Sequence, residues 1–132
     1  MSSTPRRFVA PFMAAAVVFL LLDAAWLTTM ASRFYRPAIG HLMREDFGLA
    51  AAVAFYAIYL TGLVIFVVRP AADERTALTR GALFGVVCYA TYDLTNQATI
   101  VGWPWQVTVV DLAWGAFVTA VSAWAGYRAR GW

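Results

Sequence analysis

Three aspartates interrupt long apolar stretches of this sequence, and they are the residues whose type and position could do chemistry. Asp23, Asp93 and Asp111 each lie in a run that is otherwise almost free of charge. An ionised aspartate at the centre of a bilayer costs about 2.5–3.5 kcal/mol on insertion scales, so such residues pair, take up a proton or meet water. Acids of this kind can bind a cation, relay a proton or hold helices together by hydrogen bonds.

The composition indicates that these runs lie in a membrane. Of the 132 residues, 62% are hydrophobic and only 13% are charged, whereas about 25% of residues in soluble domains are charged. A soluble domain this short could not bury so much apolar side chain. The ten basic residues are all arginines that lie between the apolar runs. We therefore interpret them as topology signals and expect no nucleic-acid partner.

The apolar runs predict four membrane-spanning helices, because each approaches the roughly 20 residues needed to cross about 30 Å of hydrocarbon. The predicted spans are residues 8–30, 49–68, 82–101 and 107–127. Long continuous runs favour helices over a barrel, whose strands would alternate over about 10 residues. The expected fold is an all-α integral membrane four-helix bundle, with residues 1–132 as a single transmembrane domain. Pro70 is expected to end the second helix and Asp73 to start the third.

The distribution of arginines predicts the orientation of these helices. Seven arginines lie in the N-terminal segment, the second loop and the C-terminal segment, and three lie in the first loop. The positive-inside rule then places both termini in the cytoplasm. In the first loop, Pro37 followed by the apolar Ile39, Leu42 and Met43 favours a short helix along the outer interface, with a plain polar loop as the alternative.

This topology places the three aspartates at a similar depth, in the outer half of the membrane. On the third helix, Tyr89, Asp93, Asn96 and Gln97 share one face by their spacing. On the first and fourth helices the pattern Asp-x-Ala-Trp occurs twice, either by chance or as the remnant of an inverted repeat. The predicted ligand-binding residues are Asp23, Trp26, Tyr89, Asp93, Asn96, Gln97, Asp111 and Trp114.

Other signals predict no catalytic residue, cofactor or metal. His41 is the only histidine and Cys88 the only cysteine, which excludes a haem held by two histidines and an intramolecular disulfide. The sequence contains no phosphate loop, no Ser-His-Asp set and no Cys/His cluster. Gly81 and Gly85 permit a close contact between helices, either within the chain or across a dimer.

The order of the motifs resembles that of a known family. The segments that carry the likeness are Leu22-Asp23-Ala24-Ala25-Trp26-Leu27, Phe34-Tyr35-Arg36, Tyr92-Asp93-Leu94-Thr95-Asn96-Gln97-Ala98-Thr99, Gly102-Trp103-Pro104 and Val110-Asp111-Leu112-Ala113-Trp114-Gly115. Together they resemble the bacterial membrane-protein family catalogued as domain of unknown function 2177, over nearly the whole chain. The resemblance implies a small protein of the bacterial inner membrane with four helices. It also implies that the three aspartates, Trp26, Asn96 and Trp114 belong to the family pattern, and it carries no reaction.

Three functions follow as expectations. The first is an outward-facing acidic pocket that binds or transports a small polar ligand, an ion or a lipid headgroup, a role that would favour a homo-oligomer. The second is an accessory subunit of a larger membrane complex, in which the aspartates serve helix packing. The third is an enzyme acting on lipid with an aspartate as general base. The lipid bilayer is the expected partner in all three.

Overall fold

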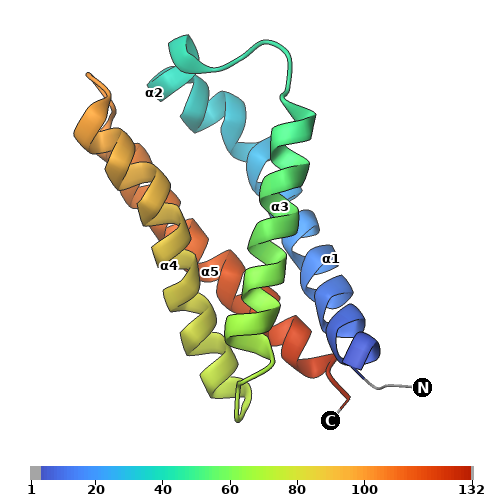
Figure 1. The fold of residues 1–132 in the computed structure, drawn as a ribbon. Helices are drawn as coiled ribbons and strands as arrows, with labels where there is room; N and C mark the ends of the chain where they lie inside the picture. Colours follow the sequence, from blue (N-terminus) through green and yellow to red (C-terminus); the bar gives the residue numbers. More distant parts are fainter. Residues whose placement is uncertain (1–3, 132) are drawn as a thin grey trace.

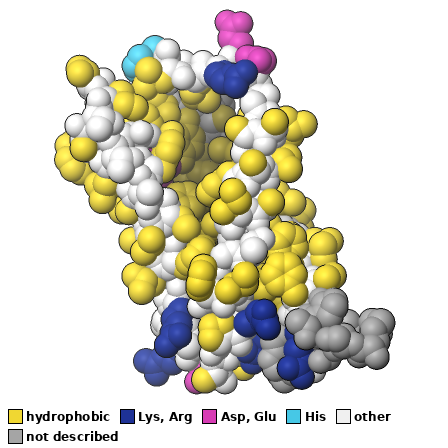
Figure 2. Space-filling model, viewed as in Figure 1, with side chains coloured by type: hydrophobic (Ala, Val, Ile, Leu, Met, Phe, Trp, Pro, Cys, Tyr) yellow, Lys and Arg dark blue, Asp and Glu magenta, His cyan; other side chains and the backbone are white. Residues whose placement is uncertain are grey.

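The computed structural model describes residues 4–131, and every regular element within them is a helix or a helical turn. Four long helices run up and down: α1 (Thr4–Met30), α3 (Leu49–Leu63), α4 (Glu74–Thr99) and α5 (Trp105–Arg128). Figure 1 shows that α1 begins and α5 ends at the same end of the bundle. Most of the basic side chains visible in Figure 2 gather there, and we call it the arginine-rich end. The opposite end, which carries the 43–48 and 100–104 links, is called the distal end.

Three of the four predicted spans are long and apolar enough to cross a membrane. They lie within the helical segments Arg7–Leu42, Leu49–Val68 and Trp105–Arg128. The second of these has the predicted bounds of 49–68, and α5 extends the predicted 107–127 by two residues at its start and one at its end. The predicted span at 82–101 falls largely within α4. This helix is long enough to cross a membrane, but it is less apolar than the other three segments and is not counted with them. Its threonines and the Asp93–Gln97 region make it more polar than the other three.

The short interfacial helix predicted between the first two spans is not confirmed. Residues 31–42 are helical, but they continue α1 through the π turn η1 (Ala31–Tyr35), the four-residue α2 (Arg36–Ile39) and the 3₁₀ turn η2 (Gly40–Leu42). Tyr35, which directly precedes α2, keeps helical dihedral angles of −71° and −44°. Pro37 fits a first helical turn without breaking it. The first helix therefore extends further than predicted.

Both π turns of the structure are followed closely by a proline. The first, η1, ends two residues before Pro37, and the second, η3 (Val64–Val68), ends two residues before Pro70. Proline lacks an N–H group, and its ring crowds the carbonyl four residues earlier in a helix. A wider preceding turn relieves that crowding. The helical segment of α3 and η3 ends before Pro70, as predicted. At this end, the Arg130 side chain donates hydrogen bonds of 2.8–3.1 Å to the carbonyls of Val68, Arg69 and Ala71.

The start of α4 also follows the prediction. Asp73 is its N-cap, and its Oδ1 accepts a hydrogen bond from the backbone N–H of Thr76 at 2.7 Å. The Thr76 side chain and this N–H hold the pKa of the fully exposed Asp73 carboxyl below its usual value. A carboxylate here stabilises the helix by occupying one of the free N–H groups of its first turn.

The closest helix contact in the bundle joins α4 to α5 through glycines. A Cβ added to Gly85 would lie 2.1 Å from the carbonyl oxygen of Gly115, and one added to Gly81 would lie 2.7 Å from Cβ of Ala123. The glycine pair singled out in the sequence therefore packs within the chain. The buried apolar core continues from this seam, with Phe19, Leu63 and Val118 fully enclosed.

We predict that Gly85→Ala destabilises the bundle. The new methyl group has no space against the α5 backbone, and overpacking of this kind costs about 1–3 kcal/mol. The midpoint of thermal unfolding in detergent should fall. Gly40→Ala is the matched control, because its Cβ would meet its nearest neighbour at an ordinary 3.7 Å. Equal midpoints for the two variants would contradict the close α4–α5 contact.

Candidate functional site

A cavity of about 740 Å³ lies between the helices, and its lining comes from α1, η1, the 43–48 link, α3, α4 and α5. In Figure 2 it appears as a hollow between α3 and α4, below the 31–48 segment. Aromatic rings dominate its lining: Phe19, Trp26, Tyr35, Phe47, Phe55, Tyr56, Tyr89, Tyr92 and Trp114. The described residues of the lining also include Asp23 and Asp111, and no Lys, Arg or His. The site is an aromatic pocket with an acidic floor.

Asp23 of α1 reaches the cavity with two long hydrogen bonds from other helices. Its Oδ1 accepts from the indole N–H of Trp114 on α5 at 3.3 Å. Its Oδ2 accepts from the hydroxyl of Tyr56 on α3 at 3.4 Å. Both distances exceed the 2.7–3.2 Å typical of good hydrogen bonds. The Asp23 carboxylate is therefore held loosely and remains half-buried.

Asp111 of α5 is held more tightly. Its Oδ1 accepts a hydrogen bond from the hydroxyl of Tyr35 at 2.5 Å. The same hydroxyl oxygen accepts from the indole N–H of Trp26 at 3.0 Å. Chains of hydrogen bonds polarise one another in a low-dielectric interior, which strengthens each link. Trp26 thus supports Asp111 through Tyr35.

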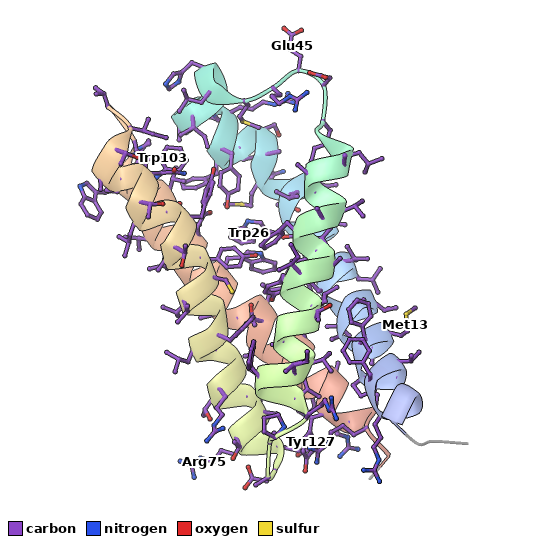
Figure 3. The ribbon with its side chains drawn as sticks, viewed as in Figure 1. Met13, Trp26, Glu45, Arg75, Trp103 and Tyr127 are labelled. Carbon is purple, nitrogen blue, oxygen red and sulfur yellow. The ribbon has the colours of Figure 1, made fainter. Side chains whose placement is uncertain are left out.

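The two Asp-x-Ala-Trp segments meet face to face. The rings of Trp26 and Trp114 stack with centroids 4.3 Å apart and planes 9° from parallel. Trp114 donates a hydrogen bond directly to Asp23 of the other segment. Trp26 donates to the hydroxyl of Tyr35, which in turn donates to Asp111. Figure 3 shows Trp26 pointing into the space between α3 and α4. The repeated pattern therefore forms one reciprocal junction between α1 and α5, which we call the tryptophan–aspartate junction.

The π turn η1 is what brings Tyr35 into this junction. Tyr35 follows Trp26 by nine residues. In an uninterrupted α-helix, nine residues at 3.6 per turn make two and a half turns, so the two side chains would point to opposite sides. The π turn changes the register between them, and π turns inside helices are frequent at functional sites. The π turn that precedes Pro37 therefore sets the position of the Tyr35 side chain, although Pro37 itself does not line the cavity.

Asp93 does not line the cavity. Its side chain is fully buried, and neither carboxylate oxygen makes a hydrogen bond of good geometry. The polar groups beside it are the Asp111 carboxyl and the Trp103 indole. A buried acid without donors is costly unless it is neutral or meets a cation. Asp93 and Asp111 therefore form a carboxyl pair, and Asp93 is the member whose oxygens accept no hydrogen bond of good geometry.

Asn96 and Gln97 lie on the same face as Asp93 but also outside the cavity lining. The Gln97 amide donates to the carbonyl of Trp103 at 2.7 Å and accepts from the Thr108 hydroxyl at 2.8 Å. It thereby fixes the link between α4 and α5. Asn96 lies beside the Tyr92 hydroxyl. Of the eight predicted site residues, five line the cavity: Asp23, Trp26, Tyr89, Asp111 and Trp114.

Two tyrosines that bind the aspartates were missing from the predicted set. Tyr35 lies within the Phe34-Tyr35-Arg36 motif that contributed to the family resemblance, so this motif was the available signal. Tyr56 lies in the uniformly apolar α3, which offers no such signal. Among the described residues, no group of three or more His, Cys, Asp or Glu is placed to hold a metal ion.

We predict that Tyr35→Phe weakens the tryptophan–aspartate junction. The change removes the hydroxyl that joins Trp26 to Asp111 and leaves both polar groups without it, which costs about 1–3 kcal/mol for a buried partner. The thermal midpoint and the near-ultraviolet circular dichroism of the stacked indoles should both decrease. Tyr127→Phe is the control, since phenylalanine keeps the ring under Arg130 at 4.2 Å. An unchanged Trp signal in Tyr35→Phe would argue against the junction.

Comparison with known proteins identifies the chain at the level of its family. No curated protein and no solved structure matches it. A family model described as "Predicted membrane protein (DUF2177)" matches residues 8–128, which confirms the resemblance noted from the motifs. The match includes all three aspartates and both tryptophans of the junction. The chain therefore belongs to the DUF2177 family of predicted membrane proteins.

Proposed function

We propose that this protein binds a small polar ligand carrying a positive charge, with its cationic group beside Asp23 and Asp111. The observation that carries this proposal is the pairing of two carboxylates with a cavity whose described lining contains no basic residue. Among the described residues, neither of these two acids forms an ion pair. A ligand cation would supply a positive partner.

The aromatic lining supports a cationic ligand independently of the acids. Cations are attracted to the faces of Trp, Tyr and Phe rings within about 6 Å, with about 0.5–2 kcal/mol per contact. Trp26, Trp114 and Tyr56 surround the Asp23 carboxylate. Because its two hydrogen bonds are long, Asp23 can turn toward a ligand at little cost. A pocket of 740 Å³ lies within the 300–1,000 Å³ range of small-ligand sites.

A second candidate, an accessory or structural subunit, is favoured by a specific observation. Asp23 and Asp111 accept hydrogen bonds that join α1 to α5, and Asp23 also joins α3. Such bonds lock bundles in membranes with modest energies. In that case the acids would hold the helices together and the cavity would have no ligand. The lipid-acting enzyme has no comparable observation in its favour.

The proposed setting is the bacterial inner membrane, with α4 as a fourth span and both termini in the cytoplasm. The contact of α4 with α5 along the glycine seam supports a crossing, since α5 is itself long and apolar enough to span. The arginines at one end support the orientation. Assembly as a homo-oligomer or within a larger complex remains part of the proposal.

We predict that Asp23→Asn weakens binding of a water-soluble cation. Phenyltrimethylammonium, titrated against the detergent-solubilised protein with tryptophan fluorescence as readout, should bind the variant at least about tenfold less tightly, because a hydrogen bond to a charged group is worth about 1.5–3 kcal/mol. Asp73→Asn is the matched control, since it removes an exposed acid at the arginine-rich end and asparagine still caps α4.

The outcome separates the two candidates. Weaker binding in Asp23→Asn with little change in thermal midpoint supports a ligand site. Equal binding in the wild type and both variants, or no saturable binding at all, would reject it. A large fall in the midpoint of Asp23→Asn without any binding in the wild type favours the structural subunit.

A further inference from the structure

We infer that the ligand is a membrane lipid with an ammonium headgroup, which enters sideways through a slot between α3 and α4. This inference rests on the proposed function, since it names the class of the cationic ligand and its route.

The slot begins where α3 and α4 no longer pack against each other. Near the middle of the bundle they still touch, because the Phe84 ring lies 3.2 Å from the position of a Cβ on Gly62 and its centroid lies 6.0 Å from that of Tyr59. Toward the distal end the two helices diverge, as Figure 1 shows. The cavity occupies the space between them. The slot is therefore confined to the distal half.

Several lining residues are exposed as well, which shows that the cavity opens through the side of the bundle. Phe55 on α3 is 46% exposed and Tyr92 on α4 is 55% exposed. Thr91 and Thr95 on α4 also line the cavity and are exposed. A residue that is both lining and exposed stands at a rim. These four residues therefore mark the two edges of the slot.

Backbone passes over the distal end, but the cavity is not sealed there, because its lining residue Phe47 is 71% exposed. The 31–42 extension of α1 and the link to α3 pass over it in Figure 1, and Phe47 of that link contributes to the lining. The slot lies between α3, which belongs to a helical segment long and apolar enough to cross a membrane, and the proposed span α4. A side opening at this level faces acyl chains instead of water. The slot therefore gives lipid direct access to the cavity.

The chemistry of the slot fits an amphiphile. Its rim includes the aromatic Phe55 and Tyr92, which can pack against acyl chains, while Asp23 and Asp111 lie deeper. An ammonium headgroup complements these acids, whereas an anionic headgroup would be repelled. Phosphatidylethanolamine matches both parts, because its ammonium group lies at the tip of the headgroup, beyond the phosphate, and its acyl chains are apolar.

The test uses the full chain in vesicles of phosphatidylethanolamine and phosphatidylglycerol, with a trace of one lipid carrying a photoactivatable acyl chain. Labelled phosphatidylethanolamine should crosslink to the slot residues Phe55, Tyr92 and Thr95 more than to Ile58, which is 73% exposed on α3 but lies outside the lining. Labelled phosphatidylglycerol should show roughly tenfold less slot crosslinking, as expected for a loss of about 1.4 kcal/mol in binding.

Thr95→Trp should fill the slot and reduce its crosslinking to labelled phosphatidylethanolamine by a similar factor. Thr99→Trp is the matched control, because Thr99 lies one turn further along the exposed face of α4 and outside the lining. If Thr95→Trp does not fold, Ala52→Phe fills the slot from the α3 side. Thermal midpoints of all variants establish that each is folded.

Equal slot crosslinking by the two lipids, or labelling that filling the slot does not change, would overturn this inference. If phenyltrimethylammonium still binds in an Asp23-dependent manner, the failure concerns the lipid and its route, and the cation site stands. If that binding is also absent, the proposed function fails as well.

Discussion

The structure depends on supplying hydrogen-bond donors to acids that lie within the helical bundle. Two of the three aspartates obtain them from indole and phenol groups of other elements at the tryptophan–aspartate junction. These donors are neutral, so the carboxylates gain partners without a buried ion pair, whose desolvation can exceed its attraction. The junction also carries two large stacked rings at the centre of the helix crossing. The same groups therefore determine how α1 meets α5 and what lines the cavity.

Local sequence signals predicted the parts of the fold that local chemistry decides. The bounds of the second span, the end of that span before Pro70 and the cap at Asp73 all follow from apolar run length, proline and a capping side chain. The clustering of the aspartates followed from helix direction and rise. The position of Tyr35 could not be predicted in the same way, because a π turn changes its register. The spacing placed Asn96 and Gln97 on one face with Tyr89, but it could not reveal that these two, unlike Tyr89, would lie outside the cavity lining.

The cavity results from a difference in side-chain size between two helix contacts. Glycines let α4 approach α5 until a single added carbon would collide with backbone. Between α3 and α4 the contact is made by aromatic rings, Tyr59 and Phe84, which keep the helix axes apart. Beyond that contact α4 stays with α5 while α3 departs (Figure 1), and the cavity lies in the space between them. A sequence pattern indicates which faces are small or bulky, but the open volume depends on three helices together.

The binding and structural interpretations need not compete, because the two cavity aspartates differ in how firmly they are held. Asp111 accepts a short bond from Tyr35, which Trp26 supports in turn, so displacing it would disrupt a connected chain of donors. Asp23 accepts only bonds of 3.3 and 3.4 Å and is half-buried, so exchanging them for a ligand's cation sacrifices little. Asp111 is thus suited to joining helices and Asp23 to meeting a ligand. Nearly identical motifs on two antiparallel helices therefore hold their aspartates with different firmness, because Tyr35 donates only to Asp111, and the proposed function assigns the cation to the more loosely held Asp23.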